Sequence, residues 1–246
     1  MHELLAAYEE QVRRRPTWEG VERVDRVIRL HHPAWRGIVW SNVDESNADA
    51  VIAREIEHFR GGGEWEWKHY SYDTPADLPD RLVAAGFVPE ETETMLIAEL
   101  AALPRESPLP DGVELREVTD EAGAAAMARV HGEGFGEINE ALEREVLEEI
   151  RQGGTRAVVA FAGDRPICAG RIEFYKGTDF AALFGGATVP EWRRRGIFRA
   201  VVAQRTGWAA DAGYRYLQTD ASDDSRPILE RLGFIPVATT TPYMHP

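Results

Sequence analysis

Four arginines, at positions 193, 194, 195 and 199, surround Gly196 in the segment Gly186–Ala200. The apolar run that ends at Val189 is typical of a buried strand, and a helical pattern starts at or near Gly196. Unpaired amides at a helix start, the positive end of the helix dipole and guanidinium groups all favour a bound anion. Because glycine lacks a side chain, a phosphate can approach the backbone closely there. The segment therefore predicts a pyrophosphate site. The alternative is that the arginines are simply solvent-exposed residues at the start of a helix.

The elements around this segment predict a mixed α/β domain. Apolar and β-branched runs bounded by turn residues predict strands, and apolar residues at helical spacing predict helices. Strands are expected over 113–118, 155–161, 167–174, 180–189, 214–219 and from 234 onward, and helices over 121–133, 139–152, 196–212 and 225–232. Early helices, an antiparallel meander and a late strand-helix-strand crossover are typical of a mixed sheet flanked by helices.

The sequence also repeats itself at an offset of 147 residues. Six residues of one 17-residue window recur in the other, against about one expected by chance. They are Asp73, Asp77, Leu82, Gly86, Phe87 and Pro89, which recur as Asp220, Asp224, Leu229, Gly233, Phe234 and Pro236. The proline-rich segment 103–112 is typical of a linker. We therefore predict two related domains, 1–102 and 112–246.

Residues 112–243 resemble the GCN5-related N-acetyltransferase (GNAT) superfamily. Arg193-x-x-Gly196-x-Phe198 matches the superfamily's pyrophosphate loop, with Phe198 in place of its final small residue, and Ile228–Phe234 matches its closing segment. The resemblance implies a GNAT-like mixed sheet of the α/β (α+β) class and acetyl-CoA between strands 180–189 and 214–219. It implies that pantetheine contacts the backbone of Ala187, Thr188 and Val189, and that pyrophosphate contacts Arg194, Arg195, Gly196, Ile197, Phe198 and Arg199.

The resemblance further implies direct transfer of an acetyl group to an amine. That reaction needs a base for the amine proton, donors for the oxyanion and, for the leaving thiolate, a proton. We nominate Glu173 as the base, with Asp220 as its rival, and the Val189 amide as the oxyanion donor. Leu229 stands where many members have a tyrosine. Three possibilities therefore remain for the proton donor. It is Ser225 or Ser222, it is Tyr243, or the thiolate leaves without a donor.

Two other features have mainly structural interpretations. His131 stands where the superfamily's substrate-facing helices join, and a loop or packing role is favoured over contact with substrate. The alternation of Trp65, Trp67, His69 and Tyr70 with polar residues favours a core strand over a ligand cage.

The first half should not bind acetyl-CoA. Under the 147-residue shift, Ser46, Asn47 and Ala48 replace the three consecutive arginines, beside further carboxylates at Asp44, Glu45 and Asp49. Carboxylates without compensating cations repel a pyrophosphate. We interpret residues 1–102 as a smaller, degenerate GNAT-like domain.

Composition excludes several functional classes. With 28 Lys+Arg against 42 Asp+Glu, the net charge of -14 disfavours nucleic acid and anionic membranes as partners and favours cationic substrates. No apolar run approaches the length of a membrane span and no signal core follows Met1, so a cytoplasmic location is expected. The single cysteine, Cys168, excludes an internal disulfide and a cysteine-based zinc cluster, and no metal site is predicted.

The function expected from these residues is an acetyl-CoA-dependent N-acetyltransferase acting on a small-molecule amine, as a monomer or homodimer. One alternative is a tandem acetyltransferase of the mycothiol-synthase type, whose members have two fuller halves. The other is a CoA-sensing module without turnover, which the leucine at position 229 and the bulky Phe198 favour.

Overall fold

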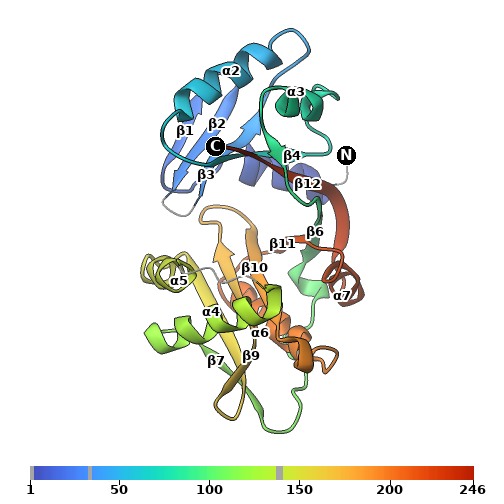
Figure 1. The fold of residues 1–246 in the computed structure, drawn as a ribbon. Coiled ribbons are helices and arrows are strands. Elements are labelled where there is room, and N and C mark those ends of the chain that lie inside the picture. The colour runs from blue at the N-terminus through green and yellow to red at the C-terminus, as the bar shows by residue number, and fades with distance from the viewer. Residues whose placement is uncertain (1–2, 33–34, 137–140) are drawn as a thin grey trace. The chain divides into compact units, whose positions relative to one another are not determined.

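The computed structural model describes residues 3–32, 35–136 and 141–246 (Figure 1). Twelve strands form a mixed sheet flanked by helices, as the sequence predicts. The chain divides into two compact units. Unit 1 comprises Met1–Leu96, Asp220–Arg226 and Pro236–Pro246, and unit 2 comprises Ile97–Thr219 and Pro227–Ile235.

The main strands of unit 1 follow the order β1-β2-β3-β4-β12. These are β1 (Val21–Val24), β2 (Val27–His32), β3 (Trp35–Ser41), β4 (Trp65–Tyr70) and β12 (Ile235–His245), with the short β5 (Val88–Pro89) paired to β12. The helices are α1 (Glu3–Tyr8), which continues into a π-helical turn (Glu9–Arg13), α2 (Ala48–Phe59) and α3 (Leu78–Ala84). Strand β6 (Glu93–Glu99) and the 3-10 turn Leu100–Ala102 lead into unit 2.

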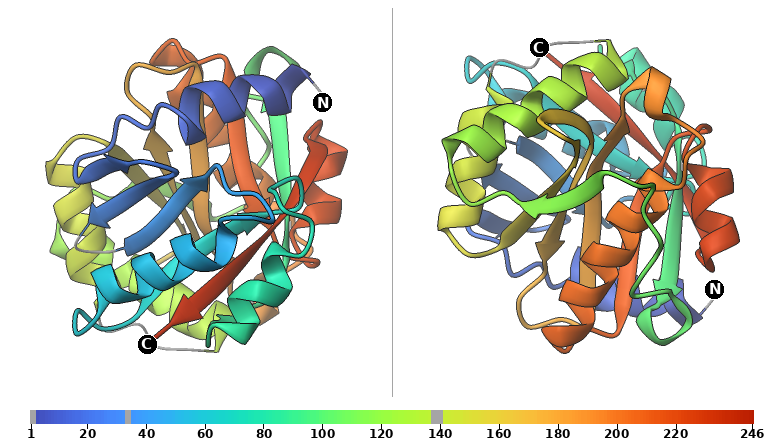
Figure 2. Two further views of the ribbon diagram at one scale, coloured as in Figure 1. Left: turned by 90° about the horizontal axis from the view of Figure 1, so that it is seen from above. Right: turned by 90° about the horizontal axis from the view of Figure 1, so that it is seen from below.

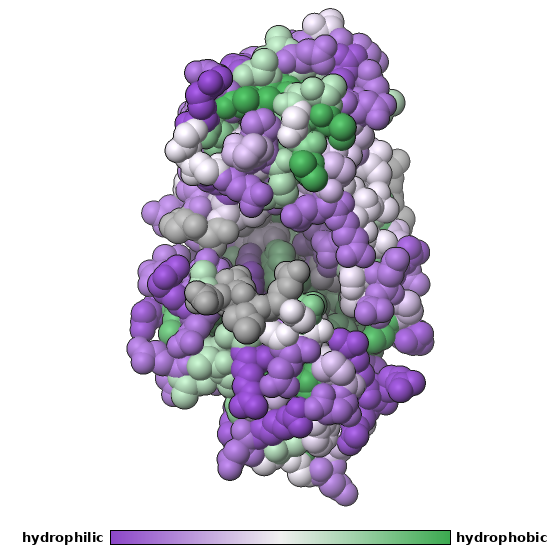
Figure 3. Space-filling view, viewed as in Figure 1, coloured by the Kyte–Doolittle hydropathy of each residue, from purple (hydrophilic) through white to green (hydrophobic). Residues whose placement is uncertain are grey.

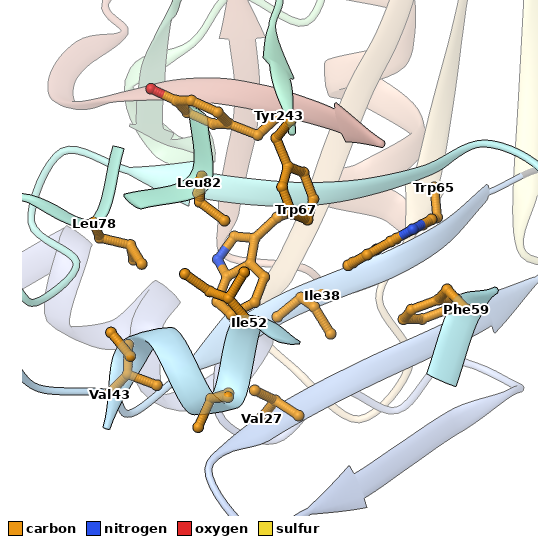
Figure 4. Packing of buried hydrophobic residues seen from close by; sticks show 13 residues of the cluster. Val27, Ile38, Val43, Ile52, Phe59, Trp65, Trp67, Leu78, Leu82 and Tyr243 are labelled. Carbon is orange, nitrogen blue, oxygen red and sulfur yellow. The ribbon is translucent and has the colours of Figure 1, made fainter. Parts of the chain in front are cut away.

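The core of unit 1 is built around the two tryptophans of β4. Trp65 and Trp67 stand two residues apart, so both point to the same face of the strand, and both are almost completely buried. Figure 4 shows Ile38, Ile52 and Leu82 around the Trp67 ring, and Phe59 stacks on Trp65 with ring centroids 4.3 Å apart. The core-strand interpretation of this aromatic run is confirmed.

Unit 2 contains the strand order β11-β10-β9-β8-β7. These strands are β7 (Val113–Glu117), β8 (Thr155–Ala162), β9 (Arg165–Phe174), β10 (Phe180–Thr188) and β11 (Tyr216–Ala221). Its helices are α4 (Glu121–Phe135), α5 (Leu142–Arg151), α6 (Ile197–Asp211) and α7 (Arg226–Leu232), with a 3-10 turn at Pro190–Trp192. The bounds agree with the predicted ones to within a few residues, except that positions 139 and 140 of the expected second helix lie outside the described residues.

Helices cover both faces of the unit 2 strands. Neighbouring residues of β9 point to opposite faces: a side chain at Gly170 would meet Arg205 of α6, whereas Arg171 faces Glu149 of α5. The right-hand view of Figure 2 shows α4 and α6 on opposite sides of the strands. Consequently the start of α6 and the α4–α5 pair approach β10 from different sides.

The internal repeat is visible in the backbone of both copies. In the first copy, Phe87 N donates to Leu82 O at 3.0 Å after a glycine with φ of 101°. In the second, Phe234 N donates to Leu229 O at 3.1 Å after a glycine with φ of 113°. Both leucines and both phenylalanines are buried. The shared residues therefore end α3 and α7 in the same way, with glycine supplying a left-handed conformation that other residues resist.

The predicted boundary differs from the compact units in two places. The expected linker 103–112 lies inside unit 2, which begins at Ile97, and the C-terminal end belongs to unit 1. Strand β12 pairs antiparallel with β4, from Thr240 opposite Tyr70 to His245 opposite Trp65. The last eleven residues therefore complete the sheet of unit 1, although they follow unit 2 in sequence. This pairing satisfies backbone groups that would otherwise form an open edge on β4.

On the face shown in Figure 3, hydrophilic residues predominate over both units and hydrophobic residues occur in small patches. Among the described residues, no helix combines the length and apolar character needed to cross a membrane.

Candidate active site

Strands β10 and β11 pair over only the first part of β10. Phe180, Ala181 and Ala182 pair in parallel with Tyr216, Leu217 and Gln218, and Thr219 Oγ1 then donates to Leu183 O at 2.9 Å. Beyond this point β10 continues to Thr188, and its described residues show no further pairing with β11. The last residues of β10 therefore do not pair with β11, and the acetyl-CoA position that the resemblance implies between these strands stays a prediction.

One of the predicted backbone contacts needs correction. Val189 N donates to Ile167 O of β9 at 3.0 Å, so this amide is already paired and is not the oxyanion donor. Because N–H groups alternate along an antiparallel strand, Ala187 also turns its amide toward β9, whereas Thr188 turns its amide toward the β11 side. Of the three residues, Thr188 is therefore the one whose N–H points away from β9.

The loop between β10 and α6 is exposed and has unused amides. Arg193, Arg194, Arg195 and Arg199 are exposed, and both Arg194 and Gly196 have positive φ, at 63° and 82°. The first amide of α6 that finds a backbone acceptor is Ala200 N, which donates to Gly196 O at 3.2 Å. Within the described part of the chain, none of the amides of residues 194–199 donates a hydrogen bond. This is the local structure that an anion site requires.

The arginine side chains have different surroundings. Arg193 donates to Thr188 O at 3.2 Å and to Gly134 O of α4 at 2.9 Å, so it fixes the loop against the strand and helix. Arg195 lies over the Trp192 ring, 4.6 Å from its centroid. Arg194, Arg195 and Arg199 make no side-chain hydrogen bond or ion pair with other described residues. Three guanidinium groups therefore remain for a ligand.

The corresponding loop of unit 1 satisfies its own amides. The Asp44 carboxylate accepts from Ser46 N at 2.9 Å, and Asp44 O accepts from Asn47 N and Ala48 N. The amides before α2 therefore already bind the Asp44 carboxylate and carbonyl, whereas the corresponding loop of unit 2 is exposed and cationic. That the first copy does not bind a pyrophosphate stays a prediction.

Phe198 fits beside β10 because of a glycine. The register between β9 and β10 shifts between Phe184 and Ala187, which places Gly185 and Gly186 in a β-bulge. A Cβ added at Gly186 would stand 2.8 Å from the Phe198 ring. The bulky residue that departs from the superfamily pattern is therefore directed at the bulge and is only half-buried.

The nominated base, Glu173, belongs to a charged cluster. Arg171 Nε lies 3.5 Å from Glu173 Oε1 and 3.6 Å from Glu149 Oε2 of α5. Glu173 lies directly opposite Ala182 of β10, where pairing with β11 ends, and its side chain is 28% exposed. Burial and the nearby Glu149 carboxylate raise the pKa of Glu173 to about 7, against the opposing effect of Arg171. A carboxylate with this pKa has the basicity that general base catalysis at neutral pH requires.

His131 supports the bulge rather than facing open solvent. It lies inside α4, one turn before the end of the helix, and is 8% exposed. Its Nε2 is 2.6 Å from Gly185 O, so this nitrogen carries a proton and donates to the carbonyl. Burial lowers the pKa of His131, which keeps the ring neutral. The packing role favoured from sequence agrees with this position.

The remaining predicted residues have the following local surroundings. Ser225 Oγ donates to Ser222 O at 3.2 Å in the turn before α7, and Leu229 is buried. Tyr243 belongs to the hydrophobic core of unit 1 (Figure 4). The rival base Asp220 is ion-paired to Lys68, with Oδ2 and Nζ 2.6 Å apart. The roles assigned to Ser225 and Tyr243 stay predictions.

Sequence reasoning missed one buried cation beside the bulge. Arg205 of α6 is 1% exposed, and its NH1 donates to Arg171 O at 2.9 Å and to Phe184 O at 3.3 Å. It thereby binds carbonyls of both strands next to the bulge. A signal was present, since Arg205 falls on the apolar stripe of Ile197, Val201 and Trp208.

Both the sequence and the fold of this chain are similar to those of acetyltransferases. Residues 124–234 match the model of the acetyltransferase (GNAT) family. This segment belongs to the GNAT family. The GNAT segment contains β10, the arginine loop, α6 and the Leu-Gly-Phe end of α7, which are the features described above.

Solved structures extend the similarity over the whole chain. A GCN5-related N-acetyltransferase from Kribbella flavida has a TM-score of 0.72 at 17% identity, covering 99% of this chain and 94% of its own. A conserved protein of unknown function from Staphylococcus epidermidis has a TM-score of 0.66 at 12% identity, with 96% of each chain covered.

A tandem GNAT protein from the clavulanic acid biosynthesis pathway has a TM-score of 0.60 at 14% identity, covering 94% of this chain and 85% of its own. At these identities the similarities show the fold, here a GNAT-like fold in a tandem arrangement. No curated protein matches the sequence.

Proposed function

We propose that the protein is an acetyl-CoA-dependent N-acetyltransferase whose cofactor site lies in unit 2. The observation that carries this proposal is the segment of residues 194–199, where unpaired amides at the start of α6 stand among exposed cationic side chains. This donor set is matched to an anion that carries two phosphates. Family membership of residues 124–234 supports the same assignment.

The donor set fits acetyl-CoA in two places. The amides of residues 194–199, with Arg194, Arg195 and Arg199, would hold the pyrophosphate by charge-assisted hydrogen bonds. The Thr188 amide, on the β11 side of β10, would hold the part of the cofactor that lies along the strand. Acetyl-CoA supplies an acyl group that is already activated as a thioester.

The protein's own groups then supply the proton transfer. An amine is protonated at neutral pH and must lose a proton before it is a nucleophile. Glu173, with a pKa near 7, is about half ionised at neutral pH and accepts that proton at a carboxylate oxygen. Burial and the Glu149 carboxylate raise the pKa of Glu173, and Arg171 lowers it. A small cationic amine also suits the net charge of -14.

The leaving thiolate has no tyrosine at the family position, because Leu229 is a buried apolar residue. Ser225, Ser222 and Tyr243 are the candidate hydroxyl donors, and Ser225→Ala, Ser222→Ala and Tyr243→Phe separate them. A loss of turnover in one variant only, without a change in cofactor affinity, would assign the donor. Unchanged turnover in all three variants would indicate that the thiolate leaves unassisted.

The experiment that tests the proposal combines binding and turnover. Calorimetric titration with CoA measures cofactor binding, and release of free thiol from acetyl-CoA over a panel of small amines measures transfer. We expect Arg195→Ala and Gly196→Glu to weaken binding at least about tenfold, because each removes or opposes a phosphate contact. The control is Ser46→Glu in the corresponding loop of unit 1, which should bind normally.

A CoA-sensing module is the second candidate, favoured by the absence of a hydroxyl at position 229. It predicts cofactor binding that the loop variants abolish, with no thiol release for any acceptor. An absence of CoA binding in the unaltered protein would refute both proposals.

A further inference from the structure

Three side chains with metal-binding atoms converge in unit 1, on elements that carry none of the residues assigned above. They are Glu22 of β1, His31 of β2 and His58 in the last turn of α2 (elements labelled in Figure 1). The Nε2 atoms of the two histidines are 3.4 Å apart. Glu22 Oε2 lies 3.5 Å from His31 Nε2 and 3.9 Å from His58 Nε2.

The local structure explains why these residues meet. Glu22 pairs with Arg29 across the β1–β2 hairpin, and His31 stands two residues after Arg29, so all three side chains share one face. Arg29 binds Glu55 of α2 on that face. His58 follows Glu55 by three residues, so it lies on the same side of the helix, one turn further on. Strand alternation and helical spacing together bring the three ligands to one point.

The spacing of the three atoms matches a metal ion. A point equidistant from atoms 3.4, 3.5 and 3.9 Å apart lies about 2.1 Å from each of them. This is the usual length of zinc–nitrogen and zinc–oxygen bonds, and an imidazole pair 3.4 Å apart corresponds to an edge of a zinc tetrahedron. The three side chains are 34% to 45% exposed, which leaves room for water as a fourth ligand.

Neighbouring groups fix the ligands in place. Arg29 NH1 donates to Glu22 Oε2 at 3.0 Å and orients the carboxylate. The charge of Arg29 is balanced by Glu55, which is fully buried and accepts from Arg29 Nε at 2.5 Å. The Phe59 ring stacks on His31 and meets His58 edge-on, with centroids 5.3 and 4.9 Å away. Outer contacts of this kind orient the ligands of metal sites.

We propose that Glu22, His31 and His58 form a binding site for a divalent transition metal of the zinc type. Two imidazoles and one carboxylate are a ligand set that suits zinc, copper and nickel better than magnesium or calcium. The three ligands come from three separate elements, so the bound ion joins the end of α2 to the β1–β2 hairpin. Because the unfolded chain does not hold these atoms together, metal binding stabilises unit 1.

The test uses the full-length protein without an affinity tag, freed of metal by EDTA and dialysis. Titration with Zn²⁺ against a chromophoric chelator should show one equivalent bound, and Zn²⁺ should raise the melting temperature. Co²⁺ in place of Zn²⁺ should give the visible absorption of a low-coordinate nitrogen–oxygen site. We expect His58→Gln to weaken Zn²⁺ binding at least about tenfold, with His69→Gln, a histidine of β4, as the matched control.

Glu22→Gln is a second variant that keeps the shape of the side chain, and it stays informative should His58→Gln fail to fold. It should weaken Zn²⁺ binding while CoA binding remains unchanged. Absence of stoichiometric Zn²⁺ binding would overturn the proposal, as would equal losses in His58→Gln and His69→Gln. CoA titration of the same samples is independent of this result, so failure of the metal site and failure of the acetyltransferase assignment are distinguishable.

Discussion

Replacing Glu173 by glutamine tests both the assignment of the base and the physical origin of its basicity. The substitution keeps the shape of the side chain but removes the carboxylate. Since general bases contribute roughly 10²- to 10⁴-fold to rate, we expect kcat to fall at least about 100-fold with little change in CoA affinity. The unaltered enzyme should gain activity as pH rises through about 7, because the base must be ionised to accept a proton.

The same substitution should change stability in a way that depends on pH. The pKa of Glu173 rises from 4.5 to about 7 on folding. Between these values the folded protein keeps a proton that the unfolded chain releases, so the stability of the unaltered protein falls by about 1.4 kcal/mol per pH unit. The full penalty of about 3 kcal/mol is present above pH 7 and absent below the unfolded pKa. Glutamine carries no charge and avoids this penalty.

Urea unfolding at pH 5.5 and pH 8.5 measures the difference. Glu173→Gln should gain about 2 kcal/mol more stability relative to the unaltered protein at pH 8.5 than at pH 5.5. The control is Glu148→Gln, an exposed glutamate of α5 that should show no such dependence. An equal effect of Glu173→Gln at both pH values would mean that the carboxyl has an ordinary pKa, and the argument for its role would fail.

Three further predictions follow from single contacts. Glu149→Gln removes a charge that raises the pKa of the base, so the pH–rate profile should shift to lower pH, and an unchanged profile would contradict the cluster described here. Gly185→Ala and Gly163→Ala introduce Cβ atoms at similar φ, 57° and 60°, but only the first meets a side chain, His131, at 2.6 Å. Gly163→Ala should therefore cost about 1 kcal/mol in urea unfolding and Gly185→Ala clearly more, and equal costs would exclude the steric reason. Truncation before Pro236 removes most of β12 and should unfold unit 1, measured by the fluorescence of its buried tryptophans, because β4 loses one of its two neighbouring strands and the core loses Tyr243.

The sequence by itself determined the features that depend on neighbouring residues. The arginine loop was predictable because a strand end, a glycine and a helix start are local, and their chemistry follows from residue type. The ends of α3 and α7 were predictable for the same reason, since Gly86 and Gly233 provide the left-handed turn within a few residues of the helix. The burial of Trp65 and Trp67 followed from strand alternation alone.

Only the tertiary structure decided which atoms of distant segments meet. The register of β9 against β10 occupies the Val189 amide and leaves that of Thr188 directed away from β9. Helix packing gives Glu173 the neighbours that raise its pKa. The same holds for the convergence of Glu22, His31 and His58 in unit 1, for which the sequence predicted no metal site. Such contacts depend on strand register and on how helices are seated against the sheet, and these are set by packing of the whole core rather than by the residues adjacent in sequence.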